Sequence, residues 1–197
     1  MMRRSRLFSF GRDRDGATLA EFAILLPVLA LLTFAIIEFA LVLWQHQQAQ
    51  IAVSRALRLA TTRALVDPAD FTDCNGPNGS AATEQAGTSC SAVAGGGVWG
   101  PETCTVSSPG YCDPALLADM LAEVQALFPE AEASNMVVEL EGAGLGFVGF
   151  GRPVPMVKVR LTGIDYQFIA IGGLAGLGDL TLPDFEATAP AEDLSGA

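Results

Sequence analysis

The sequence has little positive charge and almost no histidine. Its 197 residues include 11 lysines and arginines against 22 aspartates and glutamates, and the formal net charge is -11. Such an acidic chain repels a phosphate backbone, which argues against nucleic-acid binding. The only histidine, His46, lies far in sequence from the cysteines, so a cysteine–histidine pair for metal binding or catalysis has no support.

Enzyme motifs are absent or lack their structural context. The sequence contains no G-x-S-x-G, no H-E-x-x-H and no phosphate-binding loop. Gly144, Gly146 and Gly149 form a G-x-G-x-x-G string, but Arg152-Pro153 follows it where a dinucleotide site needs a helix, which favours a hairpin connection. An acidic surface alone does not identify a general acid–base pair. We therefore expect a protein that is not an enzyme, with no cofactor and no small-molecule substrate.

The positive charge that is present gathers at the N-terminus. Five arginines precede Gly16, whereas only six basic residues follow Trp44, against eighteen acidic ones. A short basic end, then an apolar run, then an acidic body follows the positive-inside rule. The pattern predicts that residues 1–16 are a cytoplasmic leader and that the body is exported.

The apolar run predicts a transmembrane helix over residues 17–44. No charge occurs from Phe22 to Ile37; Glu38 follows, and the run then continues to Trp44. As a helix this stretch is about 42 Å long at ~1.5 Å per residue. It exceeds a hydrocarbon core of ~30 Å, so Glu21 and Glu38 fit its two edges, and Trp44 fits an interfacial anchor. Glu38 is either an interfacial residue without a specific role or a partner for a neighbouring subunit.

The helix is predicted to continue outside the membrane over residues 45–66. This stretch lacks glycine and proline, and Asp67-Pro68 supplies a stop. Small and apolar residues recur at helical spacing: Ala49, Ala52, Val53, Ala56, Leu57, Ala60 and Ala64. Amphipathicity requires that something covers this face, either the chain's own exported domain or other copies and partners.

All four cysteines lie after the apolar run, in a turn-rich region over residues 67–112. They are Cys74, Cys90, Cys104 and Cys112. An even number of cysteines in an exported segment indicates two disulfides, and the absence of a C-x-x-C pair makes a metal site or free thiols the weaker alternatives. Four cysteines allow three connectivities, and the sequence does not choose among them.

Residues 113–197 are predicted to form an exported α+β domain. Asp113 and Pro114 are typical of a helix N-terminus, and an amphipathic helix follows to Phe128. Strands are predicted over residues 135–141, 154–163 and 164–171, with a last one within residues 180–190. The fold class is thus α+β: a long N-terminal transmembrane helix that extends into a small antiparallel sheet domain with one packed helix.

The stretch GATLAEF, Gly16 to Phe22, resembles the processing site of type IV prepilins. Glycine offers a peptidase an unhindered, extended scissile bond, and cleavage after Gly16 makes Glu21 the fifth residue of the product. The new amine of Ala17 and the Glu21 carboxylate are both costly in a bilayer without a partner. If chains stack with an axial offset, Glu21 of one chain meets the Ala17 amine of the next.

The wider pattern, GATLAEFAILLPVLALLTFAIIEFALVLW, resembles the TadE-like family of Tad/Flp pilus assembly proteins. The resemblance rests on Gly16, the Glu21-Phe22 pair and Pro27; it covers about residues 16–63, and more weakly the strands from residue 135 onward. It implies cleavage between Gly16 and Ala17 by a prepilin peptidase, processing and assembly roles for Glu21 and Phe22, and a helix bend at Pro27. It also implies a single-pass location in the bacterial inner membrane, with the C-terminal domain on the periplasmic or extracellular side.

The partners that the resemblance implies are other pilins or pseudopilins and pilus assembly proteins.

Competing interpretations of the N-terminal stretch stay open. Glu21 is alternatively the first polar residue of an ordinary signal anchor, reaching the headgroups. A third interpretation is a secretory signal peptide that is removed. It has little support, because no A-x-A-like cleavage site follows the apolar core in this sequence. The alternative function is a membrane-tethered exported binding domain, uncleaved and unrelated to pili; an exported hydrolase is a more distant one.

Overall fold

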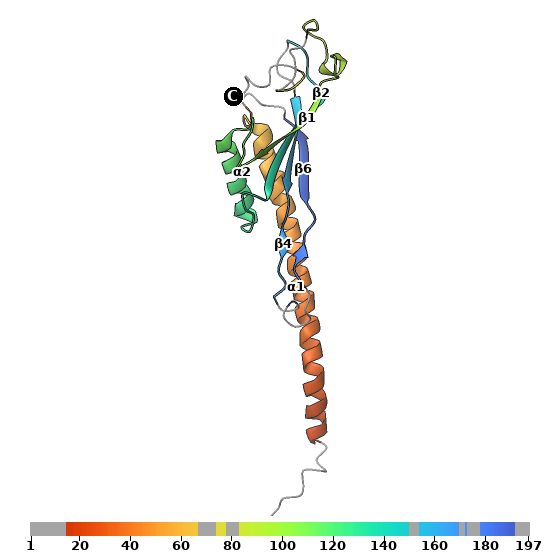
Figure 1. Ribbon diagram of the computed structural model, residues 1–197. Helices are drawn as coiled ribbons and strands as arrows, with labels where there is room; N and C mark the ends of the chain where they lie inside the picture. Colours follow the sequence, from red (N-terminus) through yellow and green to blue (C-terminus); the bar gives the residue numbers. More distant parts are fainter. Residues whose placement is uncertain are drawn as a thin grey trace, which may run out of the picture. The chain divides into compact units, whose positions relative to one another are not determined.

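The computed structural model describes residues 15–66, 74–77, 83–149, 154–169, 172 and 178–191 (Figure 1). The chain divides into two compact units. The first comprises Met1–Val42 with Gln167–Asp179, and the second comprises Leu43–Tyr166 with Leu180–Ala197. The predicted basic leader lies outside the described residues, except for Asp15 and Gly16 at its end.

Helix α1, Asp15–Thr62, contributes to both units. The prediction extended this helix to Val66, four residues too far. The chain leaves the helix because Leu65 and Val66 are needed elsewhere: the Leu65 carbonyl accepts a hydrogen bond from the Asp113 amide at 2.7 Å, and Val66 forms a β-bridge with Cys112. Both side chains are buried, so this extended segment belongs to the core of the second unit.

The C-terminal part of α1 packs within the second unit. Six of the seven small or apolar residues predicted to form one face are buried: Ala49, Ala52, Val53, Ala56, Leu57 and Ala60. Ala64, the seventh, lies beyond the helix and is half-buried. Of the two alternatives for what covers this face, the structure selects the chain's own domain.

The second unit contains a four-stranded antiparallel sheet in the order β1-β2-β3-β6. Its strands are β1, Val98–Thr105; β2, Met136–Leu145; β3, Val154–Leu161; and β6, Phe185–Pro190. The glycine-rich segment between β2 and β3 joins two antiparallel neighbours, so the predicted hairpin connection is confirmed and the dinucleotide interpretation is excluded by context. Two short strands, β4 (Asp165–Tyr166) and β5 (Leu180–Thr181), pair separately.

The two faces of this sheet differ, as the period-two pattern predicts. Val138, Leu140, Val157, Val159 and Phe185 share the buried face. On the opposite face, an Nη atom of Arg160 lies 2.9 Å from Glu139 and the other lies 3.1 Å from Asp184. Hydrogen bonds to these two carboxylates, Glu139 first, raise the pKa of Arg160.

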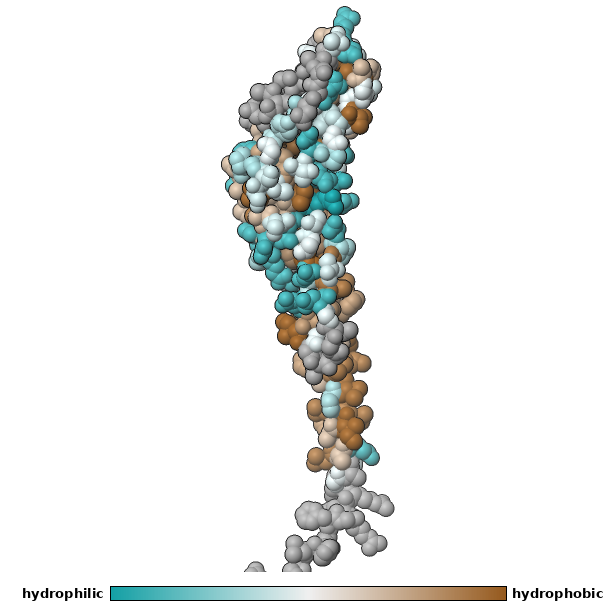
Figure 2. Space-filling model, in the orientation of Figure 1, coloured by the Kyte–Doolittle hydropathy of each residue, from teal (hydrophilic) through white to brown (hydrophobic). Residues whose placement is uncertain are grey.

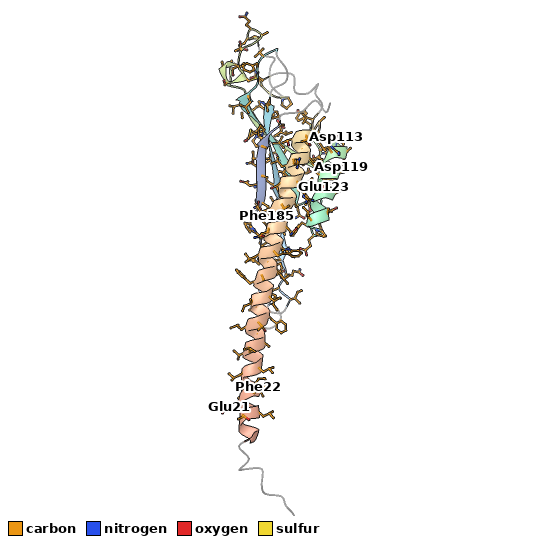
Figure 3. All side chains as sticks on the ribbon, turned by 180° about the vertical axis from the view of Figure 1, so that it is seen from behind. Glu21, Phe22, Asp113, Asp119, Glu123 and Phe185 are labelled. Carbon is orange, nitrogen blue, oxygen red and sulfur yellow. A yellow bond between two sulfur atoms is a disulfide. The ribbon has the colours of Figure 1, made fainter. Side chains whose placement is uncertain are left out.

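Helix α2, Pro114–Leu127, begins as predicted. The Asp113 side chain accepts a hydrogen bond from the Ala115 amide at 2.9 Å, which is the expected N-cap interaction. Leu116, Leu117, Met120 and Val124 are buried. Asp119 and Glu123 lie on the exposed side of α2, four residues apart (Figure 3).

Two strand predictions need correction. Of the predicted strand over residues 164–171, the described part, residues 164–169, contains only the two-residue strand β4; the chain passes into the first unit at Gln167, and residues 170 and 171 lie outside the described residues. Strand β1 and the short 3-10 helix η1, Cys90–Ala92, lie in the region that the sequence presented only as turn-rich. Gly100 and Pro101 interrupt the pattern of β1, and the register shifts between Trp99 and Glu102; an edge strand tolerates both features.

Candidate functional site

The first described turn of α1 contains Gly16, and nothing in the fold requires a glycine there. A Cβ atom built at Gly16 would meet no atom within 4 Å, and the backbone is not in the left-handed region that favours glycine. Glycine within a helix is less favourable than alanine by about 1 kcal/mol. The intramolecular contacts of the described residues therefore do not explain this glycine.

Glu21 and Phe22 lie one turn further along α1 and are exposed (Figure 3). The Phe22 side chain is 64% exposed. Within the described part of the chain, the Glu21 carboxylate has no hydrogen bond and no ion pair. Residues 17 and 21 are separated by about 6 Å along a helix axis. The carboxylate is thus free to meet a donor from another molecule near the helix terminus.

Pro27 lies inside α1, and the helix is continuous through it. Proline has no amide hydrogen, so the carbonyl of Ala23 loses the helical hydrogen bond that residue 27 would otherwise donate. Neighbouring helices or local adjustment satisfy such carbonyls when the helix is in a membrane. The bend predicted at Pro27 stays a prediction.

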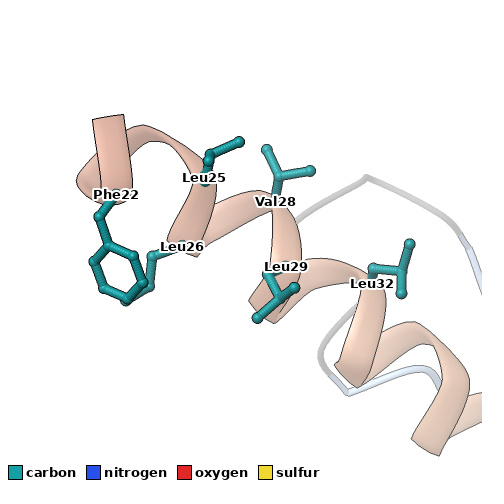
Figure 4. A pocket seen from close by; sticks show the side chains of 6 residues that line it. All are labelled: Phe22, Leu25, Leu26, Val28, Leu29 and Leu32. Atoms are coloured by element: carbon teal, nitrogen blue, oxygen red, sulfur yellow. The ribbon is translucent and has the colours of Figure 1, made fainter. Parts of the chain in front are cut away.

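Apolar side chains surround α1 in the first unit (Figure 2). A hollow on this surface is lined entirely by apolar residues of the one helix: Phe22, Leu25, Leu26, Val28, Leu29 and Leu32 (Figure 4). Because no polar group lines it, the hollow offers no hydrogen bond to orient a polar ligand. A surface of this kind fits lipid chains or another apolar helix.

The apolar surface makes α1 the one candidate membrane span among the described residues. The helix is long and apolar enough to cross a bilayer from Thr18 onward. Only 6% of its most hydrophobic window is buried within the chain, unlike the core helix of a globular protein. Trp44, which the sequence places at the outer edge of the run, is 59% exposed.

Glu38 is the exception on this surface, and the sequence did not predict its environment. Its side chain is only 5% exposed, and Oε1 accepts a hydrogen bond from the Ile169 amide at 2.6 Å. The two alternatives offered from sequence, a residue without a role and a partner for a neighbouring subunit, both missed this contact within the chain. The missing signal is a long-range one, since 131 residues separate the two groups.

The four cysteines form two disulfides, Cys74–Cys90 and Cys104–Cys112. This is one of the three connectivities that the sequence left open. The first disulfide packs with Val93 and Val148 in a small apolar cluster. The second joins β1 to the residue that precedes the α2 cap. A group of three or more metal-ligating side chains is not found among the described residues.

A tryptophan organises the region around the first disulfide. The ring of Trp99 lies against Gly76 and Gly142, where an added Cβ would overlap it. These two glycines are therefore required by close approach. Sequence reasoning treated this region as a loop stabilised by disulfides and did not predict the contribution of the tryptophan.

His46 follows the apolar run by two residues in the sequence. In the structure it is half-buried and packs edge-on against Phe185, with ring centroids 5.0 Å apart. It therefore contributes to the packing of the second unit, which a lone histidine in the sequence gives no means of predicting.

Fold and site together define a class of protein: a long apolar N-terminal helix, exposed over its first half, followed by a disulfide-bonded α+β domain. Comparison with known families identifies the helical part. Residues 16–58 match the model of the family described as TadE-like protein, so the chain carries a TadE-like domain that begins at Gly16 and includes Glu21, Phe22 and Pro27. No curated protein and no solved structure matches the chain.

Proposed function

We propose that the chain is a pilus assembly protein of the TadE type, a pseudopilin-like component of a Tad/Flp system that supports adhesion and biofilm formation. The observation that carries the proposal is Gly16. It is a glycine that the fold does not need, placed five residues before an exposed glutamate at the entry to an apolar helix. The match to the TadE-like family from residue 16 supports the same interpretation.

The proposed processing step is hydrolysis of the peptide bond between Gly16 and Ala17 by a prepilin peptidase. The exposed position of Gly16 in the first turn of α1 supports it, since glycine weakens that turn and lets the chain unwind to the extended form that a peptidase needs. Residues 1–16 are then the basic leader, left on the cytoplasmic side. Phe22 presents an apolar ring beside Glu21 for recognition by the peptidase or by the next subunit.

The proposed organisation follows from burial and composition. Residues 17–44 span the inner membrane once, residues 45–66 continue as the extramembrane helix and its end, and the cysteine region 67–112 and the domain 113–197 lie on the periplasmic or extracellular side. Two disulfides support the export of this body, because such bonds persist in oxidising compartments. The acidic charge argues against a nucleic-acid partner.

The proposed assembly step is an ion pair between subunits. After cleavage, Ala17 carries a free amine, and Glu21 is a carboxylate without a partner in the described part of its own chain. In a low-dielectric environment both groups need an opposite charge. An axial offset between neighbouring helices pairs Glu21 of one subunit with Ala17 of another, and a bend at Pro27 adjusts how the helices pack. The role is one of assembly and does not require catalysis.

The proposal is tested with variants of Gly16 and Glu21 in cells that assemble Tad/Flp pili. Replacing Gly16 with valine should leave the full-length chain uncleaved in the membrane. Glu21→Gln should leave the chain membrane-inserted but reduce pilus assembly, because the amide cannot form the ion pair. Glu123→Gln is the matched control, since Glu123 is an exposed carboxylate on α2. Normal pili in the Glu21→Gln strain would overturn the assembly role.

The alternative is an uncleaved, membrane-tethered binding domain unrelated to pili. It keeps the apolar span and the exported domain but gives Gly16 and Glu21 no role. Under this alternative, neither the Gly16 nor the Glu21 variant differs from the Glu123→Gln control.

A further inference from the structure

The connection between β4 and β5, residues 167–179, is an unusually apolar loop. No charged residue occurs from Gln167 to Gly178, and apart from Gln167 the stretch consists only of Phe, Ile, Leu, Ala and Gly. Charged residues flank it, with Asp165 before it and Asp179 at its end, both exposed. A loop in water is normally polar. This pattern, an apolar loop between charged ends, is typical of a segment that enters an apolar surrounding and returns.

The loop is attached to α1 within the first unit. The Ile169 amide donates a hydrogen bond to Glu38 Oε1 at 2.6 Å, and the Glu38 side chain is 5% exposed. Glu38 precedes Trp44 by six residues, or about 9 Å along a helix axis. The contact therefore holds the loop at the level of the outer part of the apolar run.

The surface of α1 at this level is apolar. Ile37, Phe39 and Leu41 are 54%, 63% and 43% exposed. Ile169, held at the same level by its own backbone, is 85% exposed, more than any other large apolar side chain in the described residues. The Ile169 side chain is therefore exposed beside an exposed apolar stretch of α1, and both surfaces suit the same apolar environment.

We propose that Ile169 and the adjacent Phe168, at the start of the β4–β5 connection, insert into the outer leaflet of the bilayer, and that Glu38 fixes them there. The inference rests on the membrane insertion of α1 that the proposed function includes. The protein then contacts the membrane at two places, the span and the segment that contains Phe168 and Ile169. The second contact restricts rotation of the helix about its own axis.

The hydrogen bond between Glu38 and Ile169 suits this environment. A glutamate in the outer part of a span and a loop amide at the same depth each need a partner when water is scarce. A hydrogen bond to a carboxylate is among the stronger ones in proteins. The same contact satisfies both groups, and it explains why a carboxylate interrupts the apolar run at this position.

Site-specific photo-crosslinking tests the proposal in the full-length chain. p-Benzoylphenylalanine is placed at position 169, and the protein is reconstituted in vesicles of phosphatidylethanolamine and phosphatidylglycerol. The same residue at position 29 is the positive control within the span, and at position 123, on the exposed polar side of α2, the negative control. After illumination, mass spectrometry should find phospholipid adducts at 169 comparable to those at 29, and none at 123.

The outcomes are distinguishable. Lipid adducts at 29 without any at 169 overturn the loop insertion and leave the span intact. The experiment is then repeated in native membranes. If position 169 forms adducts only with another protein there, the insertion of Ile169 into lipid is overturned, and Ile169 belongs to a protein-docking surface instead. If neither position 29 nor position 169 forms lipid adducts, α1 is not inserted in the membrane, and the proposed function is contradicted as well.

Amide exchange in the reconstituted protein tests the role of Glu38. Glu38→Gln retains an oxygen acceptor and should keep the Ile169 amide protected from exchange, whereas Glu38→Leu should lose the protection. Equal protection in the two variants would show that the side chain of residue 38 does not hold the loop. That result would overturn its positioning role.

Discussion

The two halves of α1 belong to one helix but differ in what covers them. In the second unit, Ala52, Ala56 and Ala60 are fully buried against the chain's own domain. In the first unit, Leu25, Leu29 and Phe34 are 64%, 67% and 50% exposed. The first half is apolar on every side, whereas the second half has an apolar stripe at helical spacing. Residue size also separates them: small residues allow close packing within a protein, and a continuous cover of large apolar residues needs lipid or another apolar helix.

We expect stability and function to depend on different halves of this helix. Substitutions in the buried half should change the free energy of unfolding of the second unit. Substitutions in the exposed half should leave that free energy unchanged and alter membrane insertion, processing or assembly.

The largest effect is expected for Phe185→Ala in β6. Phe185 is fully buried, packs with His46 and shares the inner face of the sheet with Leu161. Truncating a buried phenylalanine costs about 3–5 kcal/mol. Urea unfolding of the full-length chain in detergent micelles measures the loss.

Phe34→Ala is the matched control for Phe185→Ala. Phe34 is half-exposed on α1 in the first unit, so the unfolding of the second unit should keep its wild-type midpoint. Equal destabilisation by the two substitutions would show that the exposed half also supports the fold of the domain.

The next largest effect is expected from removal of the Cys74–Cys90 disulfide. Its cysteines are 16 residues apart, against 8 for Cys104–Cys112. In the loop-entropy description, replacing the first pair by serines costs about 3 kcal/mol and the second about 2.5 kcal/mol. Thermal unfolding of the two double variants, compared with wild type, measures both. A variant as stable as the wild-type chain would mean that the corresponding disulfide does not constrain the unfolded state.

Enlarging a small residue should have a smaller effect, and only in the buried half. Ala52→Leu places three more carbon atoms where no side-chain area is exposed, and overpacking costs about 1–3 kcal/mol. Ala40→Leu is the control, because Ala40 is exposed on the same helix. Unfolding midpoints of the two variants should differ; equal midpoints would contradict the division of α1 at its centre.

The smallest effect is expected for the ion pair between Arg63 and Asp119. Arg63 Nη1 lies 2.8 Å from Asp119 Oδ2, but both side chains are more than half exposed. Exposed pairs contribute less than about 1 kcal/mol. A double-mutant cycle with Arg63→Met and Asp119→Asn measures the coupling, and a larger coupling would show that the junction after α1 is less solvated than its exposure indicates.

The elements that sequence predicted best are those with local signals. Asp113 and Pro114 mark the start of α2, and the Asp113 side chain accepts a hydrogen bond from the amide only two residues further along the chain. The alternation of β2 and β3 and the helical spacing from Ala49 to Ala60 each arise within a few residues. The fold class and the TadE-like N-terminus follow from such signals, because period and local motif are written in contiguous residues.

The elements that sequence missed depend on distant partners. β1 has an irregular sequence and becomes a strand because β2 pairs with it. Helix α1 ends earlier than predicted because the Leu65 carbonyl accepts a hydrogen bond from the Asp113 amide. Glu38 is buried where the Ile169 amide donates a hydrogen bond to its carboxylate. The choice among three disulfide connectivities is also a long-range property. None of these contacts leaves a periodic or local trace in the sequence.

The mature N-terminus tests the central claim most directly. The full-length gene is expressed in cells with and without a prepilin peptidase, and the membrane-bound protein is analysed by intact mass and by N-terminal peptides. With the peptidase, the chain should begin at Ala17, and without it the leader should remain. A chain that keeps Met1 or residues up to Gly16 in peptidase-positive cells, while pili assemble normally, would contradict the account.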